Sequence, residues 1–179
     1  MAKPIAIVID WFGPYQQLDE AKSAARRDYD DGLYMLIGKQ KYEKKRRLKY
    51  VGLAKDLESR LKKDHPAISR LQGCIIWLGE VASAGVSGPK RKTTEQRLDL
   101  AEWALCYFLE LPLNEKKRSN PPPQPVTLLN RWWAKDYESR RKNRPIKDWP
   151  DIIDYVGEDW GAKTAKLISI ETWTPKDFS

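Results

Sequence analysis

The chain has 179 residues, enough to bury the core of one domain, and its 32% charged and 41% hydrophobic content excludes a disordered chain. The 33 Lys and Arg residues outnumber the 25 Asp and Glu residues, which gives a formal net charge of +8. This basic surplus suggests a polyanionic partner such as a nucleic acid; the alternative is a soluble basic protein that has none.

The N-terminal segment predicts a short strand over residues 4–11, ended by Gly13 and Pro14, and then a helix over residues 18–27 from its Ala, Glu, Lys and Arg content. The apolar run at residues 5–9 is too short for a signal peptide or a membrane span. We therefore expect a cytoplasmic protein that has no membrane partner.

Residues 32–38 and 50–53 are short apolar segments, and each holds a Tyr beside a Gly. Such segments on either side of a polar connection predict a β-hairpin. The connection concentrates basic residues, among them Lys44, Lys45, Arg46 and Arg47. They form either a solvated loop or contacts to DNA phosphates, which position a duplex without reading its sequence.

A helix is expected to begin near Asp56, whose side chain suits an N-terminal cap, with Leu57 and Leu61 as its apolar stripe. Arg60 borders that stripe, as either a solvated residue on the helix flank or a functional one. His65 follows just before a proline, where the helix must end or bend. It is the single histidine of the chain, so no zinc-ligand cluster is expected.

A third, central strand is predicted over residues 73–82, then an exposed basic loop over residues 83–93, and then a strong helix over residues 94–109. Cys74 falls in this strand and Cys106 in this helix, and neither belongs to a Cys-x-x-Cys pair. That placement is typical of thiols that fill a core in a reducing compartment.

Glu102 lies on the predicted buried face of this helix, between Leu98 and Leu105. An ionised carboxylate among Leu side chains is costly unless a cation or hydrogen-bond donors compensate it. A divalent metal ion would do so, and so would Arg60 as a structural ion pair.

A proline run at residues 121–125 predicts a stiff connector, and residues 126–142 are then expected to form a helix. The aromatic and basic residues of this region form either a nucleic-acid surface or a packed accessory element, and packing is the commoner role. Residues 166–173 are a candidate last strand, with the N-terminal strand as its candidate partner.

The triplets Gly32-Leu33-Tyr34 and Tyr50-Val51-Gly52, followed by Arg60 on a helix, resemble the GIY-YIG nuclease superfamily. The similarity continues with Glu102 in a later helix and covers about residues 31–115. Its implied fold is α/β (α+β), with a small three-stranded, mainly antiparallel sheet flanked by helices.

Two further positions follow from the resemblance. Asn114 comes after the Glu102 helix at the interval typical of the family, and Asn120 is the rival candidate. His65 lies where members often carry a His, as a candidate proton shuttle or as an exposed His in a turn. Several members place a Lys where this chain has Leu53, so either Lys55 or a residue of the basic run at 44–49 substitutes, or the proton route differs.

We expect a single domain over residues 1–179, with a catalytic core at residues 31–115. Residues 1–30 would form an N-terminal extension, and residues 121–179 a basic, Trp-rich C-terminal extension. A homodimer is the simplest way to cut both strands with one site per subunit.

The resemblance implies a DNA endonuclease that hydrolyses phosphodiester bonds with Mg²⁺ or Mn²⁺ held by Glu102. Arg60 would bind the scissile phosphate, and Tyr34 would take a proton from the attacking water, with Tyr50 assisting or acting as the alternative base. A free phenol has a pKa of about 10, so neighbouring cations must stabilise the phenolate.

The basic residues beside this site are the expected contacts to DNA phosphates: Lys44, Lys45, Arg46, Arg47 and Lys55. A non-catalytic DNA-binding module that keeps the same fold is the alternative. A structural protein that uses the Trp-rich C-terminal region is a third hypothesis, and it predicts no salt-dependent affinity for DNA.

Overall fold

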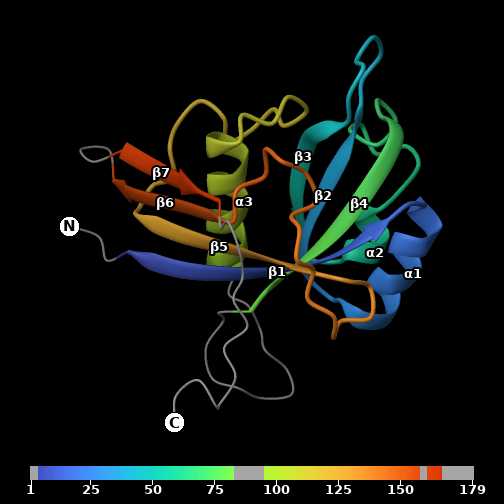
Figure 1. Ribbon diagram of the computed structural model, residues 1–179, viewed down its shortest axis with the longest axis horizontal. Helices are drawn as coiled ribbons and strands as arrows, with labels where there is room; N and C mark the ends of the chain where they lie inside the picture. The colour runs from blue at the N-terminus through green and yellow to red at the C-terminus, as the bar shows by residue number, and fades with distance from the viewer. Residues whose placement is uncertain (1–3, 83–94, 158–160, 167–179) are drawn as a thin grey trace.

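The computed structural model describes residues 4–82, 95–157 and 161–166, which contain one curled sheet and three helices (Figure 1). The seven strands of the sheet follow the order β3-β2-β4-β1-β5-β6-β7. The elements are β1 (Ile5–Tyr15), α1 (Leu18–Asp28), β2 (Gly32–Lys39), β3 (Arg47–Ala54), α2 (Leu57–Arg60), β4 (Gln72–Val81), α3 (Glu95–Phe108), β5 (Val126–Trp133), β6 (Ile152–Gly157) and β7 (Gly161–Ala165).

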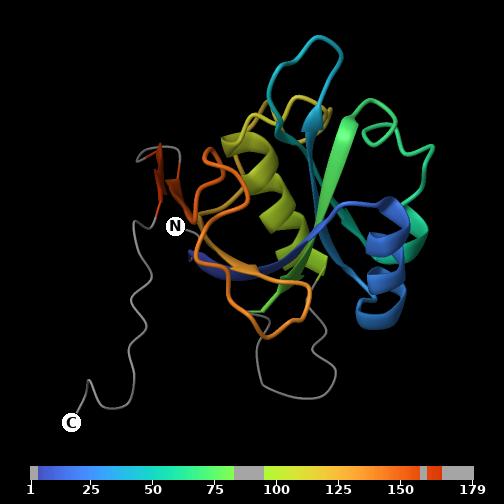
Figure 2. The same ribbon diagram turned by 45° about the vertical axis from the view of Figure 1, so that its right-hand side comes forward.

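The prediction of a small three-stranded, mainly antiparallel sheet flanked by helices is wrong. β1 pairs antiparallel with β4 and parallel with β5, so the sheet is mixed, and it curls into a half-barrel (Figure 2). The segments expected to be extensions belong to this same sheet: residues 1–30 supply its middle strand, and residues 121–179 supply β5, β6 and β7. β2, not β4, lies at the centre of the three strands of the predicted core.

The sheet has a hydrophobic core on each face. Figure 2 shows α3 on one side of the sheet and α1 on the other. Along β2, Leu33 and Met35 pack in the core that contains α3, whereas Tyr34 and Leu36 pack in the core that contains α1 and α2. Because side chains of a strand alternate between faces, a strand covered on both faces reads as a continuous apolar run, as this one does.

The local predictions are confirmed for the hairpin of β2 and β3, for α1, for β4 and for α3. The helix at Asp56 also begins as expected, because this side chain accepts a hydrogen bond from the Ser59 amide at 2.9 Å, but α2 is only four residues long. The predicted basic loop at residues 83–93 lies outside the described residues. No helix of the described segments is long and apolar enough to cross a membrane.

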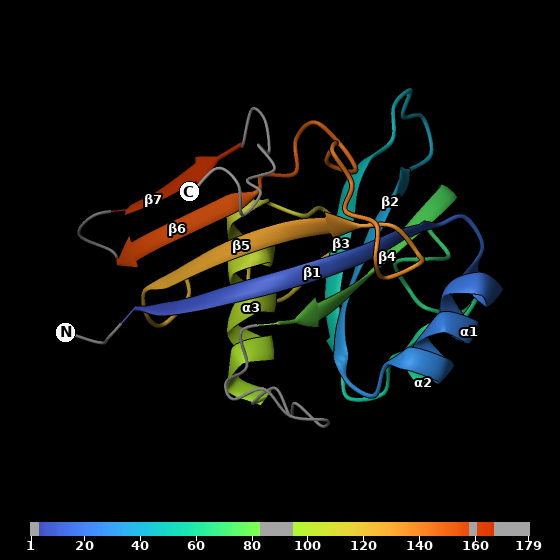
Figure 3. The same ribbon diagram turned by 60° about the horizontal axis from the view of Figure 1, so that its bottom comes forward.

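The helix predicted over residues 126–142 is wrong, because residues 126–133 form β5. Its buried and half-buried side chains alternate strictly along the strand, as they do when one face of a sheet packs on a core. Trp132 and Trp149 are buried against each other, with ring centroids 4.3 Å apart, so both have the packing role. Most of the candidate strand at residues 166–173 lies outside the described residues, and β4 and β5 already flank β1 (Figure 3).

β3 is the outermost strand at its end of the sheet. Its outer backbone edge is closed by Asn114, which follows α3 in the chain, and by Glu102, which belongs to α3. The Val51 amide donates to Asn114 Oδ1 at 3.0 Å, and Asn114 Nδ2 donates to the Val51 carbonyl at 2.7 Å. The Leu53 amide donates to Glu102 Oε1 at 3.0 Å. An unpaired strand edge invites pairing with other chains, so these side chains protect the edge as well as lining the site described below.

We expect Asn114→Ala to lower the free energy of unfolding by about 2–4 kcal/mol, because it leaves the buried amide and carbonyl of Val51 without partners. Urea unfolding followed by tryptophan fluorescence measures this change. Asn120→Ala is the matched control, since Asn120 is exposed, and its effect should stay within about 0.5 kcal/mol. Equal effects of the two substitutions would contradict the edge-closing role.

Candidate active site

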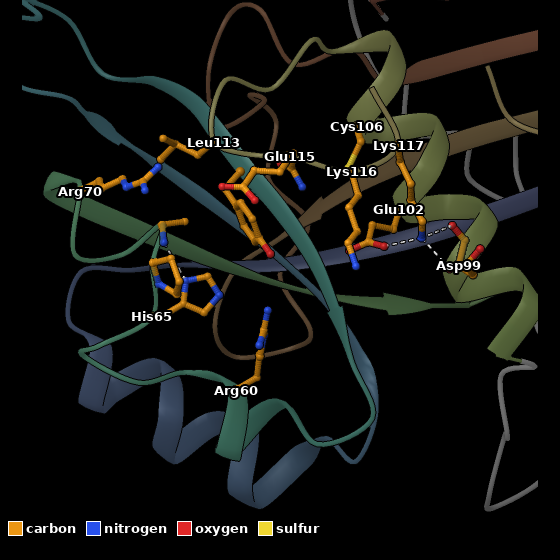
Figure 4. Close-up of a pocket in the computed structure, with 14 residues that line it drawn as sticks. Arg60, His65, Arg70, Asp99, Glu102, Cys106, Leu113, Glu115, Lys116 and Lys117 are labelled. Carbon is orange, nitrogen blue, oxygen red and sulfur yellow. Dashed lines mark hydrogen bonds and ion pairs between the residues drawn. The ribbon is translucent and has the colours of Figure 1, made fainter. Parts of the chain in front are cut away.

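A cleft of about 520 Å³ lies at the outer edge of β3, where the two faces of the sheet meet (Figure 4). The segment from α2 to residue 70 forms one wall, and α3 with the loop that follows it forms the other. Five of the six predicted catalytic residues line this cleft: Tyr50, Arg60, His65, Glu102 and Asn114.

The sixth, Tyr34, lies directly behind the cleft and is fully buried. Arg60 Nε donates to its phenol oxygen at 3.1 Å, and His65 Nε2 lies 2.9 Å from the same oxygen. The Tyr34 hydroxyl in turn donates to the Tyr50 hydroxyl at 3.5 Å. The two phenols, the imidazole and the guanidinium therefore form one connected network centred on Tyr34.

The hydrogen bonds of His65 determine which ring nitrogen carries the proton. Its Nδ1 accepts from the Ala67 amide at 3.1 Å, so the neutral ring is protonated on Nε2 and donates to Tyr34. Burial, followed by the positive charge of Arg60, lowers the pKa of His65 from its ordinary value. The imidazole is therefore neutral at pH 7 and serves as a donor to Tyr34.

This lowered pKa makes stability depend on pH. Below a pH of about 6.5 the unfolded chain binds a proton that the folded protein resists, so His65 lowers stability as the pH falls. We expect a slope of at most about 1.4 kcal/mol per pH unit from this group. Urea unfolding of the wild type between pH 7.5 and 5 should show this loss, and His65→Gln should be less sensitive; identical pH dependence would contradict the assignment.

Tyr34 and Tyr50 differ in what they can reach. Burial, followed by the neighbouring Tyr50, raises the pKa of Tyr34 above its ordinary value, and Arg60 only partly opposes this. Tyr34 therefore stays protonated at neutral pH, and it does not line the cleft. Tyr50 is half-buried and lines the cleft. The water-facing phenol is thus the second tyrosine of the motif, not the first.

Gly52 leaves the space that the Tyr34 ring needs. The two residues face each other across the hairpin, and a Cβ added at Gly52 would lie 2.5 Å from Tyr34 Cζ. Any larger residue would move the ring and with it the hydrogen bonds of its hydroxyl. The glycine therefore allows the close approach of the Tyr34 ring to the backbone of β3.

Glu102 is compensated by a residue that the sequence did not indicate. Its side chain is 16% exposed, and Lys117 Nζ lies 2.5 Å from Glu102 Oε2 and also 2.5 Å from Asp99 Oδ1. An ion pair of Glu102 with Arg60, one of the two compensations considered, is therefore wrong, since Arg60 contacts Tyr34 instead. Figure 4 shows the ammonium between the two carboxylates.

The carboxylate oxygens around the Lys117 ammonium are of the type that binds divalent cations in proteins. Asp99 and Glu102 come from successive turns of α3, and their oxygens already converge on one positive group. Mg²⁺ is commonly bound by one or two carboxylates together with water and phosphate oxygens, and Asp99 and Glu102 are two carboxylates of this kind. Within the described segments, no group of three or more His, Cys, Asp or Glu side chains is placed to hold a metal.

The cleft also contains charged residues that sequence reasoning missed, namely Arg70, Asp99, Glu115, Lys116 and Lys117. A weak signal was present, because a run of basic residues at 116–118 follows a helix that carries two carboxylates three residues apart. Cys106 lines the cleft as well, but burial raises the pKa of its thiol to about 12, so it is not a nucleophile at neutral pH.

The predicted DNA contacts lie outside the cleft. Lys44, Lys45 and Arg46 are exposed on the β2–β3 connection, which projects beyond the sheet in Figure 1, and Arg47 is exposed at the start of β3. Lys55 is exposed just after β3. Lys49, from the same basic run, is instead buried and pairs with Glu43 at 2.5 Å.

Comparison with models of protein families, with curated proteins and with solved structures finds no match for this chain.

Proposed function

We propose that the protein is a divalent-metal-dependent endonuclease that hydrolyses phosphodiester bonds in DNA. The observation that carries this proposal is the convergence of Tyr50, Arg60, His65 and Glu102 on one cleft, although they come from β3, α2, the loop after it and α3. Phosphodiester hydrolysis needs an activated water, a group that neutralises phosphate charge and a stabiliser of the leaving oxygen. This cleft contains side chains suited to each task.

Arg60 is assigned to the scissile phosphate. Its guanidinium is exposed in the cleft, and the hydrogen bond from Nε to Tyr34 fixes the plane of the group. A planar fork in a fixed orientation matches the geometry of two phosphate oxygens, which a flexible ammonium does not.

Tyr50 is assigned to proton transfer from the attacking water, because it is the phenol that reaches the cleft. Tyr34, to which the sequence interpretation gave this role, orients Tyr50 and Arg60 from behind. Glu102, with Asp99, would hold Mg²⁺ or Mn²⁺, and a bound ion would neutralise charge on the phosphate and on the departing oxygen.

DNA binding is assigned to the exposed basic residues near the cleft. The β2–β3 connection would contact phosphates that flank the cut site, in a manner weakened by salt. Cleavage of both strands would follow from a homodimer with one cleft per subunit.

Plasmid nicking tests the proposal. Supercoiled plasmid should be converted to open-circle DNA by the protein with Mg²⁺ or Mn²⁺ and should stay intact with EDTA. DNA affinity measured by fluorescence anisotropy should fall steeply with salt. Intact plasmid in every condition, together with salt-dependent binding, would instead support the non-catalytic module. If the contact of Lys117 with Asp99 and Glu102 is a permanent structural bridge, then it favours the non-catalytic DNA-binding function.

A further inference from the structure

Lys117 is held where a divalent cation would bind. Its side chain is 18% exposed, and its ammonium contacts Glu102 Oε2, Asp99 Oδ1 and the Asp99 carbonyl, the last at 3.3 Å. These are the oxygen types that Mg²⁺ and Mn²⁺ take as ligands. The ammonium thus uses acceptors that a metal ion would need.

Lys117 has a backbone conformation that is unfavourable for a lysine. Lys117 has φ +61°, in the left-handed region that residues other than glycine rarely adopt. The tertiary contacts of its side chain offset this local strain, and they include the Trp103 ring, whose centroid lies 5.9 Å from Nζ. The loop after α3 therefore places the Lys117 ammonium against the carboxylates of Asp99 and Glu102.

The Lys117 ammonium and a divalent ion would compete for the same two oxygens, Glu102 Oε2 and Asp99 Oδ1. At such short range the repulsion between a single and a double positive charge is large, even when water screens part of it. Metal binding at Glu102 therefore requires that Nζ leave, and the lost ion pairs reduce the net affinity for the metal.

We propose that Lys117 is a resident competitor for the divalent cation, so that the metal enters the cleft by displacing its ammonium from Glu102 and Asp99. This inference rests on the proposed role of Glu102 as a metal ligand. It concerns the binding of the ion, which is measured without DNA and without cleavage.

Mn²⁺ binding to the full-length protein tests the inference, with free Mn²⁺ counted by electron paramagnetic resonance. Lys117→Gln should bind Mn²⁺ at least about tenfold more tightly than the wild type. Lys116→Gln is the matched control, because it removes the same charge from the same cleft and should change the affinity by less than about threefold. Equal affinities of all three proteins, or equal gains in the two variants, would overturn the proposal.

A second pair of variants covers the case in which Lys117→Gln does not fold, since it leaves two carboxylates without their cation. Asp99→Asn and the double variant Asp99→Asn/Lys117→Gln keep the same single carboxylate and differ only at Lys117. The double variant should bind Mn²⁺ more tightly than Asp99→Asn. Absence of binding to both would show a structural bridge and overturn the inference, whereas failure of plasmid nicking alone would count against the proposed function only.

Discussion

Glu102→Gln is expected to lower the rate of Mg²⁺-dependent DNA cleavage at least about 100-fold while leaving the protein folded. The amide oxygen of Gln can still accept the hydrogen bond from the Leu53 amide, so the edge of β3 stays closed. The substitution removes the negative charge that a divalent ion requires. Single-turnover cleavage of a labelled duplex measures the rate, and circular dichroism with urea unfolding verifies the fold.

Glu115→Gln is the matched control for this substitution. Glu115 is an exposed carboxylate of the same cleft, outside the contact of Lys117 with Glu102 and Asp99. It should cleave within about threefold of the wild type, because an exposed charge is largely screened by water. Equal losses in the two variants would show that the overall charge of the cleft matters and that Glu102 has no special role.

Arg60→Lys is expected to lower the cleavage rate at saturating DNA by about 100-fold to 1,000-fold, although it keeps the positive charge. An ammonium cannot present two parallel donors to phosphate, and it loses the directed hydrogen bond of Nε to Tyr34. DNA affinity should change much less than the rate, because Lys keeps the one positive charge that Arg60 contributes to the binding of phosphate. Quench-flow cleavage and anisotropy titrations separate the two quantities.

Arg70→Lys provides the comparison for this variant. Arg70 lines the opposite part of the same wall and is exposed. Its replacement should leave the rate at saturating DNA within about threefold of the wild type, since no hydrogen bond to the tyrosine network depends on it. If Arg60→Lys behaves like Arg70→Lys, then the guanidinium of Arg60 does not contact the transition state.

Local sequence patterns predicted the part of the fold in which contacts are close in sequence. Each strand of the β2–β3 hairpin has an apolar run that contains a Tyr and a Gly, and Asp56 carries the capping side chain of α2. The same hairpin places Tyr34 opposite Gly52, so these two residues of the site come together through local pairing.

The larger sheet was not accessible in this way, because its pairing is non-local. Residues 126–133 contain Leu128, Leu129, Trp132 and Trp133, whose spacing fits a helix face as well as it fits a strand. The parallel pairing of β5 with β1 joins segments more than 100 residues apart, and it decides between the two. No local pattern reports such a partner.

The position of Lys117 in the site could not be predicted from a local sequence pattern either. The position of Glu102 on its helix predicts that burial of its carboxylate is costly, but the sequence indicates only a metal ion or Arg60 as the compensating group. The actual partner comes from a loop that turns back over α3 after Glu110, a residue with φ +49°. A cation that is placed by a loop turn has no spacing that identifies it in advance.

A crystal structure of the wild type with a short DNA duplex and Ca²⁺ tests the central claim most directly. Ca²⁺ occupies oxygen-ligand sites and usually does not support the reaction that Mg²⁺ supports, so intact DNA would be captured. We expect a backbone phosphate within hydrogen-bonding distance of Arg60 and Tyr50, beside Glu102. A duplex bound on another face, with no phosphate in this cleft, would contradict it.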